Sequence, residues 1–189
     1  MIATMALLLF GYWAGAVPFG VLIAKWLGVD IRDHGSGNIG ATNVTRVLGP
    51  VPGAIVLVLD AVKGAIPVWL AIRYSGEPWL VMATGFAAIV GHCFSPFLEF
   101  RGGKGVATAM GVFLVLDPAA TAIGVLTFIT MLELTKVPAL GSLSAALMIA
   151  ITFVYHHDRE AATLAFLTFA LMLYTHRSNI AKLRKGKPV

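Results

Sequence analysis

Long apolar runs alternate along this chain with short polar islands rich in glycine. Crossing a bilayer as a helix takes about 20 residues, and the first three apolar runs reach that length. The later runs are shorter, and Asp117 followed by Pro118 predicts a helix break between two of them. The pattern predicts an all-α integral membrane protein with about seven transmembrane helices, some short or not fully spanning. The apolar segments are 2–27, 51–73, 79–98, 105–116, 119–132, 139–155 and 161–175.

Composition favours lipid as the main solvent of the chain. Of its 189 residues, 58% are hydrophobic and 12% are charged, against about 25% charged in soluble domains. A single polytopic membrane domain over residues 1–189 is the natural interpretation. The net charge of +5 does not favour a nucleic-acid partner, because most of the excess lies beside apolar segments. One cysteine, Cys93, excludes an internal disulfide.

Basic residues indicate the orientation in the membrane, because they favour the cytoplasmic side. Seven segments with the N-terminus outside place eleven of the 14 lysines and arginines inside, and the C-terminus is then cytoplasmic. Arg73 and Arg159 would lie outside, and Lys63 lies within a span. We therefore expect both glycine-rich loops, the 133–142 region and the tail to meet at one face. The inside residues are Lys25, Arg32, Arg46, Arg101, Lys104, Lys136, Arg177, Lys182, Arg184, Lys185 and Lys187.

The first polar island, 35–43, reads G-S-G-N-I-G-A-T-N. Three glycines in six residues allow positive φ angles, and backbone amides that converge in this way bind anions. Ser36, Asn38, Thr42 and Asn43 add polar groups, and Arg46 can clasp a phosphate. The alternative is a flexible turn between helices, although nine residues are more than such a turn needs.

The second polar island, 91–108, reads G-H-C-F-S-P-F-L-E-F-R-G-G-K-G-V-A-T. Its glycines and Lys104 precede a predicted helix, and a helix N-terminus of this kind is a ready anion site. It is not a Walker A loop, because Leu98 and Gly105 stand where that motif needs glycine and serine or threonine. The alternative is a tight turn with a lysine that anchors it at the membrane surface.

Buried or interfacial ionisable residues give further candidates. His92 suits a general base at neutral pH, or it simply hydrogen-bonds to the backbone. Asp60 and Lys63 lie three apart on one face of a predicted span, where an ion pair would pin the helix against the polar loops and support the site indirectly. No metal site is expected, and His156 with its neighbours falls on the opposite side of the predicted topology.

Three function classes remain open on the residues alone. Two anion-binding loops at one face suggest an enzyme acting on two phosphorylated reactants, at least one of them an amphiphile. A transporter for phosphorylated solutes also fits short, broken helices, but the polar loops gather at one face without a matching set on the other. A purely structural role as a membrane subunit does not explain the two glycine-rich loops.

These motifs resemble the bacterial acyl-phosphate:glycerol-3-phosphate acyltransferases, the PlsY family. The long matches are residues 35–46, 91–108 and 176–186, with shorter ones at 60–67 and 141–145. The resemblance implies seven helices with an active site at the cytoplasmic face of the inner membrane. It also implies transfer of a fatty acyl group from acyl phosphate to the 1-hydroxyl of glycerol 3-phosphate, the first acylation step of phospholipid synthesis.

The resemblance assigns roles to residues of both islands and of the tail. It implies no cofactor and no nucleic-acid partner. The expected partners are membrane lipids and the two substrates. The sequence leaves the oligomeric state open, and a monomer is compatible with it. The expected catalytic residues are Ser36, Asn38 and His92. The expected ligands of glycerol 3-phosphate are Arg46, Lys104, Ser142, His176 and Asn179. The expected ligands of acyl phosphate are Ser36, Gly37, Asn38, Gly40, Ala41, Thr42, Asn43 and Gly103.

The proton acceptor for the attacking hydroxyl has three candidates. His92 is one, and a phosphate oxygen of the substrate is another, with no protein base at all. A covalent acyl-enzyme on Ser36 ranks last, because no base stands beside Ser36 in the sequence.

Overall fold

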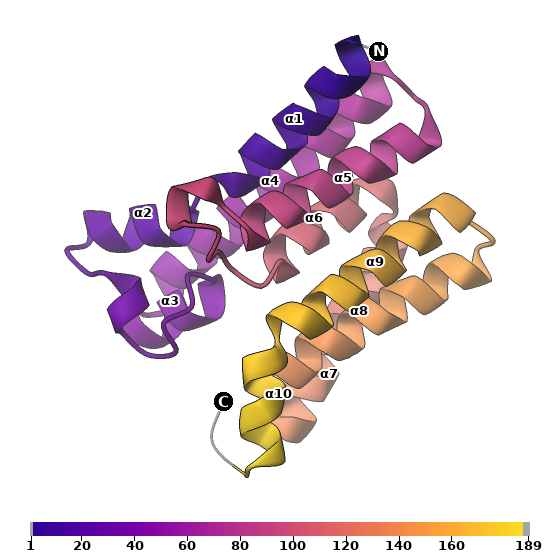
Figure 1. Ribbon diagram of the computed structural model, residues 1–189. Coiled ribbons are helices and arrows are strands. Elements are labelled where there is room, and N and C mark those ends of the chain that lie inside the picture. The colour runs from indigo at the N-terminus through magenta and orange to yellow at the C-terminus, as the bar shows by residue number, and fades with distance from the viewer. Residues whose placement is uncertain (1, 187–189) are drawn as a thin grey trace. The chain divides into compact units, whose positions relative to one another are not determined.

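The computed structural model describes residues 2–186, and every regular element among them is helical (Figure 1). Two compact units divide the chain, one up to Val112 and the other from Phe113 onward. Lys187, one of the basic residues used to orient the chain, lies outside the described residues. The helices match the apolar pattern, and the predicted break is confirmed because one helix ends at Leu116 and the next begins at Pro118.

The first unit carries both polar islands between its helices. Its long helices are α1, α4 and α5, and short helices lie within or beside the islands. Helix α6 begins in this unit and ends in the second. The elements are α1 (Ile2–Ala16), α2 (Phe19–Trp26), η1 (Ile31–Asp33), α3 (Ala41–Leu48), α4 (Pro50–Tyr74), α5 (Pro78–Cys93), η2 (Pro96–Leu98) and α6 (Val106–Leu116).

Glycines let α1 and α5 approach closely in the same direction. A Cβ added at Gly11 would press on the carbonyl of Thr84, and one at Gly15 would overlap the backbone of Ala88. Because the contacts advance together along both helices, α1 and α5 run parallel. Helix α4 precedes α5 through a three-residue turn and packs against it. The ends of α1 and α5 and the start of α4 therefore lie at one end of this unit.

A break at Val17 and Pro18 divides the first apolar run into α1 and α2. Pro18 has no amide hydrogen, so helical bonding cannot continue through it. The side chain of Ser95 donates to the carbonyl of Ala16 at 2.6 Å, and that of Lys63 donates to the carbonyl of Val17 at 2.7 Å. These bonds satisfy backbone groups that lipid cannot.

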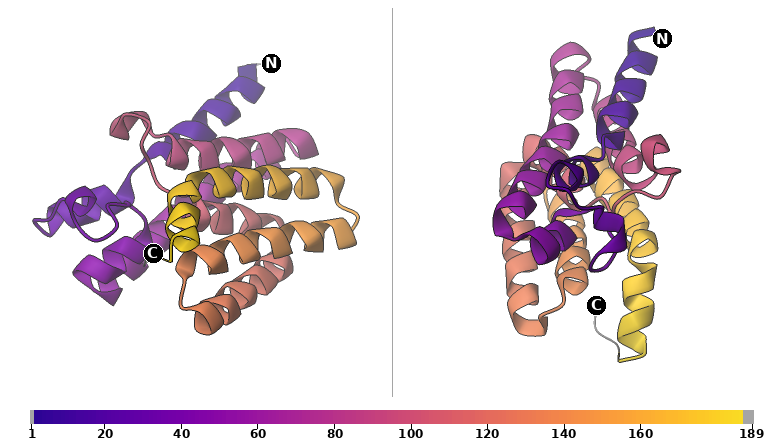
Figure 2. Two further views of the ribbon diagram at one scale, coloured as in Figure 1. Left: turned by 60° about the horizontal axis from the view of Figure 1, so that its bottom comes forward. Right: turned by 90° about the vertical axis from the view of Figure 1, so that its left-hand side faces the viewer.

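In the second unit α8 (Pro138–Tyr155) packs against both α7 (Pro118–Thr135) and α9 (Arg159–Thr175). Gly124 of α7 faces Ile149, and Gly141 of α8 faces Phe128, so each glycine admits a side chain of its neighbour. Helix α10 (Arg177–Arg184) leaves the line of α9, as the left view of Figure 2 shows.

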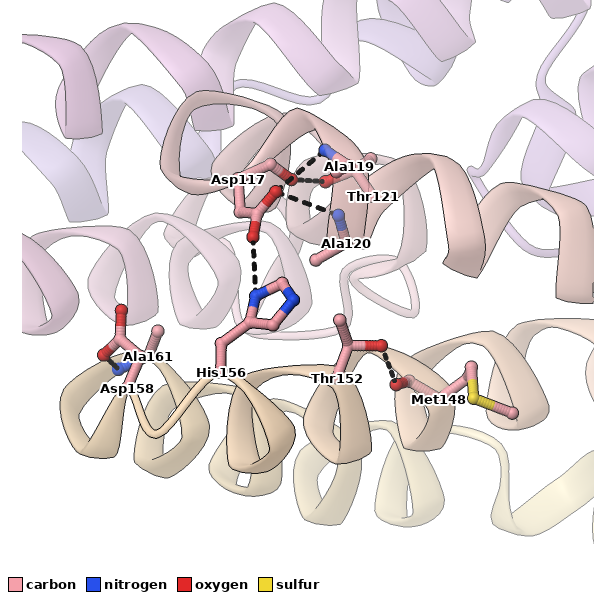
Figure 3. A network of polar contacts seen from close by, with 9 residues as sticks. All are labelled: Asp117, Ala119, Ala120, Thr121, Met148, Thr152, His156, Asp158 and Ala161. Atoms are coloured by element: carbon pink, nitrogen blue, oxygen red, sulfur yellow. Dashed lines mark hydrogen bonds and ion pairs between the residues drawn. The ribbon is translucent and has the colours of Figure 1, made fainter.

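One polar network joins two turns of the second unit (Figure 3). The Asp117 carboxylate caps α7 by accepting from the amides of Ala119 and Ala120 at 2.8 and 3.0 Å. Its other oxygen lies 3.2 Å from Nδ1 of His156, which ends α8. The turn before α7 is thereby tied to the turn after α8.

Within residues 2–186, five helical segments are long and apolar enough to cross a membrane. Helix α6 and helix α9 are shorter, with 11 and 17 residues, so the seven-span count and the orientation of the termini stay predictions. Large apolar side chains face outward on the long helices, including Val58 at 58% and Leu126 at 64% exposure. Such outward surfaces suit contact with lipid. The five segments are Ala3–Trp26, Pro50–Tyr74, Pro78–Leu98, Pro118–Thr135 and Pro138–Tyr155.

Candidate functional site

The buried side chain of Asn43 organises the first glycine-rich loop. Its oxygen accepts a hydrogen bond from the Ser36 amide at 2.8 Å. Its nitrogen donates to the carbonyls of His34 at 3.0 Å and Asn38 at 2.9 Å, with a longer contact to Ile31 at 3.4 Å. A single carboxamide therefore holds four points of the backbone, and the loop is an ordered structure around Asn43 rather than a loose turn.

Two glycines make this path around Asn43 possible. Gly35 and Gly37 have φ angles of 61° and 70°, which lie in the left-handed region. A Cβ at Gly35 would overlap the oxygen of Asn43, and one at Gly37 would lie 3.0 Å from the carbonyl of Arg32. The third glycine of the motif, Gly40, has a φ angle of −76° and precedes α3 as its N-cap.

Polar groups of this loop remain accessible at the start of α3. Ser36 and Thr42 are exposed, while Asn38 and Gly40 are partly buried. The Asn38 side chain accepts from the Gly40 amide at 2.9 Å, which fixes the turn into the helix. Arg46 is exposed in the last turn of α3. The loop thus offers hydroxyls and backbone amides with a guanidinium on the adjoining short helix.

The second glycine-rich loop folds back over the end of α5. The amides of Gly102 and Gly103 donate to the carbonyls of Cys93 and His92, each at 3.0 Å. A Cβ at Gly103 would overlap the imidazole of His92, so only glycine fits there. Lys104 is partly buried, and α6 begins two residues later as expected.

His92 lies beneath this loop with only 4% of its surface exposed. Its Nδ1 is 3.8 Å from a carboxylate oxygen of Asp60, beyond hydrogen-bond distance. The same oxygen pairs with Lys63 at 2.7 Å, and both side chains of this pair are almost completely buried. The predicted Asp60–Lys63 ion pair is therefore present in the structure, with His92 as its neighbour.

Both loops lie at the same end of the first unit and share an apolar core. Leu98 of the second island packs in one cluster with Ile31, Ile39 and Val44 from around the first. A Cβ at Gly20 of α2 would overlap the carbonyl of Ile39, so α2 lies directly against the first loop. The two candidate anion-binding loops therefore pack against the same apolar cluster.

An exposed ion pair precedes the first loop. Arg32 lies 2.7 Å from the carboxylate of Asp30, and its backbone amide also donates to that side chain. Hydrogen bonds from Arg32 hold the pKa of Asp30 well below its usual range, and Asp30 raises the pKa of Arg32 in turn. The His34 ring contacts the carbonyl of Asp30 through Nδ1 at 2.9 Å. These contacts define how the chain enters the loop.

Three predicted ligands lie in the second unit. The Ser142 hydroxyl donates to the carbonyl of Pro138 at 3.0 Å in the first turns of α8. His176 is 2% exposed at the junction of α9 and α10, and its Nδ1 contacts the carbonyl of Met172 at 2.8 Å. Asn179 is partly buried on α10. Their role as ligands stays a prediction.

Several side chains that shape the first unit escape the sequence pattern. Tyr12 donates to the carbonyl of Phe94 at 2.8 Å, and Ser95 donates to that of Ala16. Asn43 acts through the fold of its loop, a role that its place in the motif does not reveal. The signal available in the sequence is a polar residue within or beside an apolar run. Within residues 2–186, no three His, Cys, Asp or Glu side chains are grouped to hold a metal ion.

Comparisons with known proteins agree over nearly the whole chain. Residues 5–186 match the family profile described as Glycerol-3-phosphate acyltransferase. A protein of that name from Myxococcus xanthus is 51% identical over 96% of both chains. Another from Aquifex aeolicus is 39% identical over 96% of this chain and 95% of its own.

Two solved structures share the fold. One is the glycerol 3-phosphate form of PlsY (YgiH), an integral membrane glycerol 3-phosphate acyltransferase, with a TM-score of 0.94 and 37% identity. The other is the lysophosphatidic acid form, with a TM-score of 0.93 and 36% identity. Each match covers 99% of this chain and 94% of the solved chain.

Proposed function

The chain belongs to the glycerol-3-phosphate acyltransferase family and is a multi-pass membrane acyltransferase of lipid biosynthesis, and we propose acyl phosphate as its acyl donor. The acceptor is the 1-hydroxyl of glycerol 3-phosphate. The hydroxyl oxygen attacks the acyl carbonyl carbon, and the bond from that carbon to the phosphate oxygen breaks. Lysophosphatidic acid and inorganic phosphate are the products, and the hydroxyl proton leaves on a phosphate oxygen.

The observation that carries this proposal is the ordered loop around Asn43. The loop leads into the N-terminus of α3, whose first amides favour an anion beside the Ser36 hydroxyl. We assign acyl phosphate to this loop, including Gly37, Gly40, Ala41 and Thr42. The same amides stabilise the oxyanion that develops on the acyl carbon. Asn43 contributes by shaping the loop, since its side chain is directed into the backbone.

We assign glycerol 3-phosphate to the cationic groups of the first unit. Arg46 and Lys104 belong to the first unit and supply positive charge, and Gly103 places the backbone that precedes Lys104. Ser142, His176 and Asn179 remain predicted ligands on the family resemblance. The leaving group of a mixed anhydride is already good, so alignment of the reactants and neutralisation of charge carry most of the catalysis. Positioning of this kind is worth about 7–11 kcal/mol.

The environment of His92 favours a substrate phosphate oxygen as the proton acceptor. The imidazole is buried beneath Gly103, and its Nδ1 faces Asp60. We therefore assign His92 to supporting the Lys104 loop and keep Ser36 and Asn38 as the groups beside the reacting carbonyl. The Ser36 hydroxyl oxygen accepts a hydrogen bond from the Asn38 amide at 3.4 Å, and this bond orients the hydroxyl within the loop.

We place the site at the cytoplasmic face of the inner membrane. The support is the charge distribution, in which the loops 28–50 and 99–104 carry basic residues beside apolar helices. Acyl phosphate, an amphiphile, would reach the first loop from the inner leaflet.

The test is phosphate release by the detergent-solubilised protein given acyl phosphate and glycerol 3-phosphate. Lysophosphatidic acid should form in equal amount, with no need for a second compartment. Acyl-CoA and acyl carrier protein serve as competing donors, and turnover with either of them but not with acyl phosphate would refute the donor assignment. Lys104→Ala and Arg46→Ala should each raise the KM for glycerol 3-phosphate. Unchanged values for both would refute that part of the site.

A further inference from the structure

The break between α1 and α2 is held by side chains from helices far along the chain. Val17 at the break already accepts a bond from the Phe19 amide at 3.1 Å. Lys63 of α4 adds a second and shorter bond to the same carbonyl, at 2.7 Å across 46 residues of sequence. The Lys63 ammonium also lies 5.6 Å from the centre of the Phe19 ring, a cation–π distance. One ammonium therefore contacts the last residue before Pro18 and the first residue of α2.

Asp60 allows Lys63 to remain charged in this apolar place. The carboxylate lies 2.7 Å from the ammonium one helical turn away, and the two side chains are 2% and 4% exposed. A buried charge without a partner is strongly unfavourable, whereas a paired one is tolerated. The Lys63 ammonium of this pair contacts the break between α1 and α2, and the Asp60 carboxylate lies beside His92.

Helix α2 transmits the position of the break to the first glycine-rich loop. Gly20, one residue into α2, lies so close to the carbonyl of Ile39 that a methyl group would not fit. Ile39 stands between Asn38 and Gly40 and is buried with Val21 and Ala24 of the same helix. A shift of α2 would therefore displace the middle of the loop.

We propose that Lys63, held by Asp60, is a positioning residue for the loop 36–43, acting through the Val17 carbonyl and α2. This inference rests on the proposed function, because that loop is assigned to acyl phosphate. Lys63 touches no substrate. Its loss should impair the use of acyl phosphate more than the binding of glycerol 3-phosphate, since Arg46 and Lys104 remain in place.

The test compares Lys63→Met with the double variant Asp60→Asn/Lys63→Met in detergent. Lys63→Met leaves Asp60 buried without its partner, so it lowers the melting temperature as well as impairing the loop. The double variant removes both charges at nearly constant volume, so it should regain most of the melting temperature. We expect its KM for acyl phosphate to stay about tenfold above that of the parent, with the KM for glycerol 3-phosphate within about twofold.

A merely structural ion pair gives another outcome. In that case the double variant recovers both stability and the KM for acyl phosphate, and the proposal is overturned. The matched control is Val68→Ala, a fully buried position farther along α4. It should lower the melting temperature through a cavity while leaving both KM values unchanged. An equal rise in both KM values in the double variant would also contradict a role confined to this loop.

A readout without substrate separates this inference from the donor assignment. The Ser36 and Gly40 amides are bonded to side chains of the loop, so their hydrogen exchange reports its order. The double variant should exchange them about tenfold faster or more, while Gly102 and Gly103, bonded to α5, exchange as in the parent. Unchanged exchange at Ser36 and Gly40 would refute the proposal even if the donor proved to be another acyl compound.

Discussion

The side-chain oxygen of Asn43 accepts the backbone amide of Ser36 at 2.8 Å, so one buried carboxamide closes the first glycine-rich loop on itself. Asn43→Ala should release this loop, because the Ser36 amide loses its side-chain acceptor and the Asn38 carbonyl its side-chain donor, while the His34 carbonyl keeps a bond from the Gly37 amide. We expect a loss of about 1–3 kcal/mol in unfolding free energy and about 100-fold in kcat/KM for acyl phosphate. Thermal melting and phosphate release measure the two effects.

Asn43→Asp sharpens that prediction. The aspartate keeps an acceptor for Ser36 but turns a second oxygen toward the carbonyls of His34 and Asn38, so it should be no better than alanine. Thr127→Ala, a partly buried position on α7, is the control and should leave both measurements unchanged. Wild-type turnover by Asn43→Ala would show that the loop does not depend on this side chain.

Gly103→Ala should damage the enzyme by steric overlap with His92. The added methyl displaces the backbone before Lys104, and we expect about a 100-fold loss of kcat/KM for glycerol 3-phosphate. His92→Ala removes the obstacle, so Gly103→Ala/His92→Ala should recover to the level of His92→Ala alone. Steady-state kinetics on the three variants distinguish a steric effect of His92 from a role as general base. If His92 is instead the general base, both variants that lack it stay inactive by several orders of magnitude.

The predicted orientation has a direct labelling test. Cysteines at Asp33 and Arg101, both exposed beside the glycine-rich loops, should react with a membrane-impermeant thiol reagent only after the inner membrane is opened. A cysteine at Ser75, in the turn between α4 and α5, should react in intact spheroplasts. Replacing the buried Cys93 with serine removes the background. Reaction of Asp33 and Arg101 cysteines from opposite sides would refute the common face of the two loops.

Asp117 should matter for stability and not for substrate affinity. Asp117→Ala removes the cap of α7, and we expect it to lower the free energy of unfolding by about 1–2 kcal/mol. Asp117→Asn keeps an acceptor for the helix amides and should lose less. His156→Ala removes only a partly exposed ion pair, worth less than about 1 kcal/mol. Melting curves rank the variants, and a larger effect from His156→Ala than from Asp117→Ala would reverse the assignment of the cap.

The Asp30–Arg32 pair gives a pH dependence with a defined sign. Because Arg32 lowers the pKa of Asp30 in the folded protein, the pair stabilises the fold above the unfolded pKa. That contribution is complete at neutral pH and is lost as the pH falls through the lowered folded value. Carboxyl NMR on the parent should report the low pKa, and Arg32→Gln should raise it toward about 3.9 without reaching it, because the backbone amide of residue 32 still donates to Asp30. The melting temperatures of parent and variant should converge in strong acid.

The apolar pattern predicts the helices well because each must present lipid-facing side chains along its whole length. Residues 51–73 and 139–155 fall within α4 and α8 to within a residue or two at each end. The break at Val17 and Pro18 is not apparent, because an apolar run hides where the backbone leaves the helix. Helix α3 is missed for the opposite reason, since its eight residues lie in a polar island.

The site is predicted as a set of residues but not as an arrangement. The glycines and Lys104 are recognisable from their spacing, and the Asp60–Lys63 pair follows from the helical repeat. The bond from Lys63 to Val17 joins positions 46 residues apart, and no local pattern encodes it. The inward direction of Asn43 likewise depends on carbonyls supplied by the fold of the loop.

The break at Pro18 has a consequence for how the protein enters the membrane. When the first hydrophobic segment leaves the ribosome, the partners of its Ala16 and Val17 carbonyls, Ser95 and Lys63, have yet to be synthesised. The Ala16 carbonyl must stay hydrated or beside the insertion machinery until Ser95 arrives, while the Val17 carbonyl has its bond from the Phe19 amide. We therefore expect insertion of this segment to be completed only after α5 has been translated, and a chain truncated before residue 95 should be recognised as immature by membrane quality control.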